Sequence, residues 1–225
     1  PIGAILSDAP PATRRRRRYA DDDTRRAHPP DTLVEERCAI TCRAAPSFLR
    51  VGHVELHSRR AMRKEEGAAE KLAEFVRYAI GREFPEIDGT APLATQAIEM
   101  LRAFARRQAE TVTAWVRVGY VQGNMNSDNC LLSGRTMDYG PFGWMERFDP
   151  GWCPWVGGGA PYAFGAQPQA AAVNCAGLSD AFAQLVRDAA ADDGLPKAER
   201  EAAVQAVRDA VSGKFVDSFH AKNDD

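Results

Sequence analysis

Residues 120–150 read YVQGNMNSDNCLLSGRTMDYGPFGWMERFDP, and within residues 128–138 three carboxylate or amide side chains carry oxygens that can bind metals. Asp128 and Asn129 stand together in a polar loop that follows an apolar run, and Asp138 follows ten residues after Asp128. Carboxylate and amide oxygens are the ligands that hard cations such as Mg²⁺ prefer. Residues 136–138 predict a brief strand that breaks at 139–141. The stretch therefore predicts a metal site built from two neighbouring loops.

A loop Asp-Asn pair followed by an Asp-x-Gly turn is typical of kinase-like folds that hold a metal and a nucleotide. The spacing differs from that of a protein kinase, which separates the catalytic-loop Asp from the metal-binding Asn by several residues. Here Asp128 and Asn129 are adjacent, and no His-Arg-Asp triplet occurs.

The same residues resemble the signature of the selenoprotein O (SelO) family of kinase-fold protein adenylyltransferases. A second block, residues 42–55 (CRAAPSFLRVGHVE), resembles the family's Cys-Arg-Val-Ala-Pro-Ser-Phe-Leu-Arg-Phe-Gly-His-Phe-Glu. The two motifs occur in the family's order, and the resemblance extends over about residues 35–215. In the first motif the matching positions are Gly123, Met125, Asn126, Asp128, Asn129, 138–143 and 148–150.

This resemblance implies an enzyme that transfers AMP from ATP to Ser, Thr or Tyr hydroxyls of protein substrates. Asn129 and Asp138 would hold Mg²⁺, or Mn²⁺, and Asp138 would also contact ATP. Asp128 would be the catalytic base, since a carboxylate beside the metal can accept the proton of an attacking hydroxyl. Arg43 and Arg50 correspond to the family's phosphate-binding arginines, and a guanidinium fork suits phosphate oxygens.

Each of these residues also has a simpler interpretation. An Asp-Asn pair alone is most often a turn or a helix cap, and Arg43 and Arg50 alone would more often be surface or ion-pairing residues. The joint pattern favours the site. His53 and Glu55 match the family block without an assignable role, and packing or hydrogen bonding is the expected function of both.

Several departures from the family pattern keep a second class of function open. Gln122 replaces the usual His and Asn124 replaces an apolar residue. The family's N-lobe, with its nucleotide-binding Lys, normally precedes the Cys-Arg block by many more residues than are present here, and the redox-active C-terminal extension has no counterpart. We therefore expect either a divergent or truncated adenylyltransferase or a catalytically inactive pseudokinase fragment that serves as a nucleotide-binding or interaction module.

Composition limits the remaining classes. The chain has 225 residues, 44% of them hydrophobic, and a formal net charge of −2, which predicts neither general nucleic-acid affinity nor membrane attachment. Its five cysteines show no paired metal spacing, which favours free thiols in a reducing compartment. Eukaryotic members of the resembled family imply a mitochondrial location; otherwise the expectation is cytoplasmic.

Residues 1–32 differ from the rest because they contain five consecutive arginines at 14–18, three aspartates at 21–23 and little that is apolar. Such a segment cannot offset its ordering entropy, so it is predicted to be a disordered, low-complexity region. Residues 33–225 are predicted to form the SelO-like domain.

The fold class expected for that domain is α+β, mainly helical, like a protein-kinase C-lobe with a few short strands and without most of the N-lobe. A strand is predicted at 38–42, followed by a turn at 43–50. Apolar spacing predicts helices over 63–82 and 94–118. Leu178 to Ala189 and Val204 to Phe215 carry the apolar positions of two further helices.

Overall fold

The computed structural model describes the backbone of residues 2–15, 33–137, 140–155, 159–192 and 196–209. It divides the chain into two compact units, Pro1–Pro46 and Ser47–Asp225. The sequence instead predicts a boundary after residue 32. Each unit is described by itself below.

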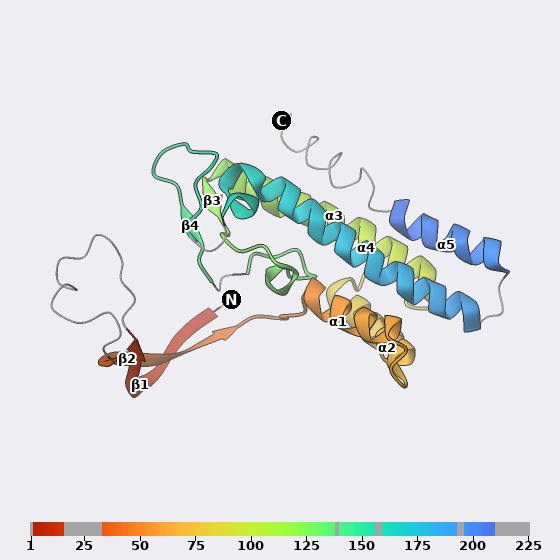
Figure 1. The fold of residues 1–225 in the computed structure, drawn as a ribbon, viewed down its shortest axis with the longest axis horizontal. Coiled ribbons are helices and arrows are strands. Elements are labelled where there is room, and N and C mark those ends of the chain that lie inside the picture. Colours follow the sequence, from red (N-terminus) through yellow and green to blue (C-terminus); the bar gives the residue numbers. More distant parts are fainter. Residues whose placement is uncertain (1, 16–32, 138–139, 156–158, 193–195, 210–225) are drawn as a thin grey trace. The chain divides into compact units, whose positions relative to one another are not determined.

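The first unit is a two-stranded antiparallel hairpin of β1 (Ile2–Arg15) and β2 (Leu33–Ala44) (Figure 1). The register shifts between Ala9 and Ala12, where Pro10 and Pro11 have no N–H to donate to the ladder. β2 contains the predicted strand 38–42, which is confirmed. β1 lies within residues 1–32, for which the sequence predicts disorder. A strand can form there because the ladder is made by backbone groups and needs few apolar side chains. Residues 16–32 lie outside the described residues.

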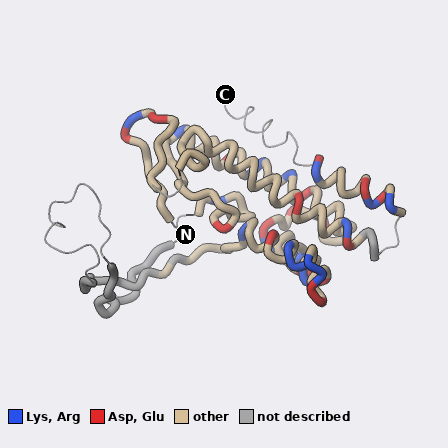
Figure 2. Tube along the Cα trace, viewed as in Figure 1, with Lys and Arg blue, Asp and Glu red and all other residues tan. Residues whose placement is uncertain are grey.

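In the second unit the chain enters α1 (Val51–Met62) directly after the predicted turn, and α2 (Ala68–Glu83) follows. The sequence predicts one helix over 63–82, so α1 was missed and the start of α2 was placed five residues too early. The two helices are separated by a turn in which Lys64 and Gly67 have positive φ values of 56° and 65°. Acidic and basic residues are mixed around this turn (Figure 2).

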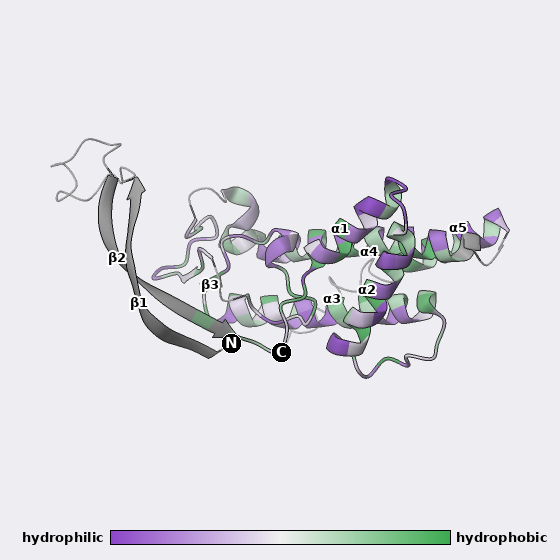
Figure 3. Cartoon of the chain, turned by 90° about the horizontal axis from the view of Figure 1, so that it is seen from below, coloured by the Kyte–Doolittle hydropathy of each residue, from purple (hydrophilic) through white to green (hydrophobic). Residues whose placement is uncertain are grey.

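Three long helices form the body of the unit. α3 (Leu93–Arg117), α4 (Gln167–Asp192) and α5 (Lys197–Asp209) run side by side (Figure 1), and α4 also packs against α1. The prediction of α3 is confirmed to within one residue at each end. Hydrophobic and hydrophilic residues alternate around α2 and α3 (Figure 3), as amphipathic packing requires. The largest fully buried side chains of the core are Phe84, Phe104, Phe182, Leu72, Ile80, Met100, Leu101, Leu132, Leu178 and Leu185.

The other two helices differ from their predicted ranges. α4 begins at Gln167, well before the predicted apolar positions at 178–189. The sequence did not indicate these first turns because they carry small alanines and polar side chains rather than a wide apolar stripe. α5 contains Val204 and Val207 of the predicted fourth helix, and residues 210–225 lie outside the described residues.

Short elements occupy the segment between α3 and α4. β3 (Tyr120–Val121) pairs antiparallel with β4 (Gly143–Trp144), and single 3-10 turns lie at Ser127–Asn129, Ala160–Tyr162 and Phe164–Ala166. The brief strand predicted at 136–138 is wrong for Thr136 and Met137, which have no strand partner, and residue 138 is not described. The strand in this segment is instead Gly143–Trp144, because these residues pair with Tyr120 and Val121, which follow α3.

The mainly helical α+β class expected from the sequence is confirmed. Within the described residues, none of the helices has both the length and the apolar content required to cross a bilayer.

Phe104 gives a test of this core. Its side chain is completely buried on α3, so Phe104→Ala is expected to lower the free energy of unfolding by about 3–5 kcal/mol through lost burial and a residual cavity. Phe148, which is 78% exposed, is the matched control, and Phe148→Ala should change stability by less than about 1 kcal/mol. Urea unfolding measures both. Equal losses would place Phe104 outside the core.

Candidate active site

The predicted Asp-Asn pair lies on a single 3-10 turn, Ser127–Asn129, between β3 and β4. The backbone N–H of Asn129 donates to the carbonyl of Asn126 at 2.8 Å, which closes the turn. Asp128 is exposed at its centre and Asn129 is half-buried. The carboxylate of Asp128 is therefore open to a ligand, while the backbone around it is held.

The start of α1 lies directly against this turn. The N–H of Val51 donates to the carbonyl of Cys130 at 2.9 Å, and the N–H of Leu132 donates to the carbonyl of Leu49 at 2.9 Å. The approach is close enough that a Cβ atom on Gly52 would lie 2.6 Å from Oδ1 of Asp128. A side chain at this position of α1 would require the carboxylate of Asp128 to shift.

Arg50 immediately precedes α1 and is half-buried. Among the described residues, its Nε is a buried donor without a hydrogen-bond partner. A buried guanidinium nitrogen that lacks a partner costs free energy unless a ligand supplies an acceptor. Arg50 therefore suits an anionic ligand beside the turn.

His53 connects Arg50 with Asp128. The backbone N–H of Arg50 donates to Nδ1 of His53 at 3.3 Å. Burial lowers the pKa of His53, the positive charge of Arg50 lowers it further, and the carboxylate of Asp128 acts in the opposite direction. A neutral imidazole in this place accepts a hydrogen bond and helps to begin α1, which agrees with the hydrogen-bonding role expected from the sequence.

Two buried glutamines hold the strand that leads into the turn. The side-chain amide of Gln122 donates to the carbonyl of Met137 at 2.9 Å, and its oxygen accepts the hydroxyl of Tyr120 at 2.6 Å. The N–H of Gln122 donates to the side-chain oxygen of Gln167 at 3.0 Å, and Gln167 donates in return to the carbonyl of Tyr120 at 3.0 Å. Gln122 thus ties the segment before the turn to the residue that precedes Asp138.

α4 and the 3-10 turn Ala160–Tyr162 hold the loop from the other side. The side-chain amide of Asn174 donates to the carbonyl of Met125 at 2.8 Å, and the hydroxyl of Tyr162 donates to the side-chain oxygen of Asn126. Sequence reasoning assigned no role to Gln167 or Asn174, and it noted Gln122 only as a departure from the family pattern. The sequence did offer one signal for such supporting residues, which is an amide side chain among apolar neighbours along a helix. A group of this kind must find a hydrogen-bond partner inside the protein.

Two predicted site residues cannot be placed beside the turn. Asp138 lies outside the described residues. Arg43 lies on β2 in the first unit, and its side chain is not described. The structure therefore brings together Asp128, Asn129 and Arg50. Within the described part of the chain, no three His, Cys, Asp or Glu side chains gather in a group that could hold a metal.

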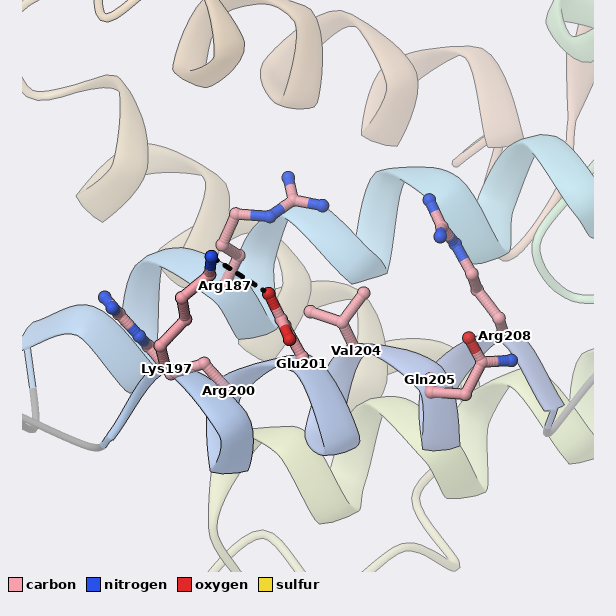
Figure 4. Close-up of a pocket in the computed structure, with 7 residues that line it drawn as sticks. All are labelled: Arg187, Lys197, Arg200, Glu201, Val204, Gln205 and Arg208. Carbon is pink, nitrogen blue, oxygen red and sulfur yellow. Dashed lines mark ion pairs between the residues drawn. The ribbon is translucent and has the colours of Figure 1, made fainter.

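A groove of about 380 Å³ lies beside the turn and is lined by Asn126, Ser127, Glu55, Tyr162 and the outer face of α4. A second groove of about 500 Å³ lies between α4 and α5 and shares no lining residue with the first. Figure 4 shows its basic side chains, and one of them, Lys197, pairs with Glu201 at 3.7 Å. Exposed pairs of this kind are typical of a solvated helix face.

The thiols near the turn are not suited to nucleophilic chemistry. Burial raises the pKa of the Cys130 thiol, and burial also raises that of Cys175 to about 12. A thiol is an effective nucleophile only as the thiolate. The reactive oxygens of the turn are therefore the better candidates for catalysis.

The family model described as "Protein adenylyltransferase SelO" matches residues 20–222, and the chain belongs to the SelO family. The resemblance noted in the sequence is thereby confirmed.

Curated relatives carry the name "Protein nucleotidyltransferase YdiU". The protein from Aromatoleum aromaticum is 41% identical over 146 residues, which are 64% of this chain and 26% of the relative. The protein from Xanthomonas oryzae pv. oryzae is 44% identical over 154 residues, which are 68% of this chain and 28% of the relative. The chain thus spans about a quarter of the length of these relatives. Both relatives are bacterial, so they lend no support to the expected mitochondrial location.

Gly52→Ala tests the close approach of α1 to the turn. Alanine in a helix is normally better than glycine by about 0.5–1 kcal/mol, but here the added methyl group would collide with Asp128. We expect Gly52→Ala to lower the free energy of unfolding by about 1–3 kcal/mol, as overpacking does. Gly81 of α2 has nothing within 4 Å of a built Cβ and is the control.

Gly81→Ala should raise the free energy of unfolding by about 0.5–1 kcal/mol. Urea unfolding measures both variants. Stabilisation of both variants by the same amount would show that Asp128 does not lie against Gly52.

Proposed function

We propose that this chain carries part of the catalytic lobe of a nucleotidyltransferase that moves AMP from ATP to Ser, Thr or Tyr hydroxyls of proteins. The observation that carries the proposal is the Ser127–Asn129 turn, which presents an exposed carboxylate and an amide oxygen beside Arg50, whose Nε has no partner among the described residues. Family membership and the printed names of the relatives support nucleotidyl transfer.

Asp128 takes the part of general base. Its carboxylate accepts the proton of the acceptor hydroxyl while that oxygen attacks the α-phosphorus of ATP, and the bond to the β-phosphate breaks to release pyrophosphate. The turn suits this role because Asp128 is exposed while the backbone that follows it is held at Cys130 by the N–H of Val51, the first residue of α1. A base held in one position contributes more to the rate than one that must first be ordered.

Arg50 contacts phosphate oxygens of the bound nucleotide. Its unpartnered Nε supplies a donor, and a charge-assisted contact of this kind contributes about 1.5–3 kcal/mol. Arg43 stays a prediction of the sequence alone, since it lies on β2 in the first unit.

Asn129 and Asp138 are the residues proposed to hold Mg²⁺ or Mn²⁺. Two protein oxygens fit Mg²⁺, since this ion usually keeps several waters and takes its other ligands from substrate phosphates. When bound, the ion neutralises charge on the phosphates. Asn129 is half-buried on a turn that a backbone hydrogen bond closes, so its side-chain amide oxygen needs little ordering before it binds the ion.

We propose a kinase-like C-lobe as the fold that presents these residues. The supporting features are the helical body, the loop between two short paired strands, and the order of the two motifs along the chain. The non-catalytic alternative gains no support from the turn, because its Asp and Asn are both present and the Asp is exposed.

The metal assignment predicts a stability change that Asp138 controls. Mg²⁺ or Mn²⁺ with ATP should raise the unfolding free energy by about 2.7 kcal/mol at a hundredfold excess over Kd. Asp138→Ala should remove that increase, whereas Glu99→Ala, at an exposed position of α3, should retain it. Thermal unfolding with and without the ion measures the effect. An unchanged increase in Asp138→Ala would remove this residue from the site.

The role of Asp128 predicts a loss of chemistry with little loss of binding. Asp128→Ala should lower AMP transfer by about two to four orders of magnitude, the size of a general-base contribution. Nucleotide affinity should stay within a few-fold. Transfer is measured with labelled ATP and a generic protein acceptor, and affinity by calorimetry. Unchanged transfer would mean that another group accepts the proton.

A further inference from the structure

Glu55 reaches the proposed catalytic turn from the middle of α1. Its Oε2 accepts a hydrogen bond from the hydroxyl of Ser127 at 2.8 Å, across 72 residues of sequence. Ser127 immediately precedes Asp128. The side chain of Glu55 is 25% exposed, so the bond lies at the inner side of the loop rather than in open solvent.

The opposite side of Glu55 faces a glycine of α4. A Cβ atom built on Gly177 would lie 2.8 Å from Oε1 of Glu55, which is closer than packed atoms approach. Gly177 costs helix stability relative to alanine, and the benefit it gives here is space for the carboxylate. α1, α4 and the turn therefore meet at this one side chain.

The ion pair that Glu55 forms within the described residues is weak. Arg59 lies one helical turn further along α1, 3.8 Å from Oε2, and is 60% exposed. An exposed pair at this spacing contributes little. The strong interaction of Glu55 is thus the charge-assisted hydrogen bond to Ser127.

We infer that Glu55 is a positioning residue: by holding Ser127, it fixes the turn that carries Asp128, and Gly177 provides the room for it to do so. The inference rests on the proposed function where it calls Asp128 the base. Its physical content, the hold of Glu55 on the turn, can be tested without any transfer of AMP.

Hydrogen exchange at the amide of Asn129 is the direct readout, because this amide closes the turn. Glu55→Ala should speed its exchange by about 10-fold to 100-fold, the change expected when a hydrogen bond to a charged group is lost. Glu55→Gln keeps an acceptor oxygen for Ser127 and should restore most of the protection. Exchange at buried amides of α3 should not change.

Further variants separate this role from a general loss of structure. Ser127→Ala should act like Glu55→Ala, and the double variant should be no faster than either one, because both remove the same bond. Glu74→Ala, at an exposed position of α2, should have no effect at Asn129. Gly177→Ala should speed exchange at Asn129 although Glu55 is intact, whereas Gly81→Ala should not.

The inference is overturned if exchange at Asn129 is the same in Glu55→Ala and the unsubstituted chain, or if the effects of Glu55→Ala and Ser127→Ala add. When AMP transfer is measured on the same variants, Glu55→Ala should lower kcat more than it raises KM for ATP, and Glu55→Gln should recover kcat. Faster exchange with unchanged kcat would show that the hold is structural and would reject the positioning role. A lack of AMP transfer by the unsubstituted chain would bear on the proposed function and not on the hold of Glu55 on the turn, which the exchange result decides.

Discussion

The two backbone hydrogen bonds between residues 49–51 and 130–132 are the constraint on which the proposed site depends. They join Val51 to Cys130 and Leu132 to Leu49, each at 2.9 Å, and so fix the start of α1 against the turn that carries Asp128. Gly52 permits this approach, since a side chain there would displace the carboxylate. Residues that are far apart in sequence thus share one rigid corner.

Buried amides maintain the other side of that corner. Gln122, Gln167 and Asn174 each donate to a backbone carbonyl, which belongs to Met137, Tyr120 of β3 and Met125, respectively. An amide buried without a partner costs about 1–3 kcal/mol, so these bonds strongly favour one arrangement of the loop. The loop can then expose the polar side chain of Asp128 while these hydrogen bonds hold its ends.

Local pattern was a good guide to α3 and a poor guide to α1. α3 carries a long apolar stripe that alternates with charged residues, and this period survives in the sequence alone. α1 is short and buries Gly52 and Ser58 together with Val51, Val54 and Ala61, and this mixture of small, polar and apolar core positions gives only a weak stripe. The short strands β3 and β4 were also beyond local reading, because two-residue strands exist only through their pairing.

The sequence by itself determined the family, because residues 42–55 and 120–150 hold its recognisable motifs. The same motifs predict Asp128, Asn129 and Arg50 as site residues, and the structure brings these three together. Only the tertiary structure decided what holds them: Glu55 on Ser127 across 72 residues, and Asn174 on Met125 across 49. The physical reason is that a supporting hydrogen bond needs only a donor and an acceptor brought close by helix packing, and such a pair leaves no period or spacing in the sequence.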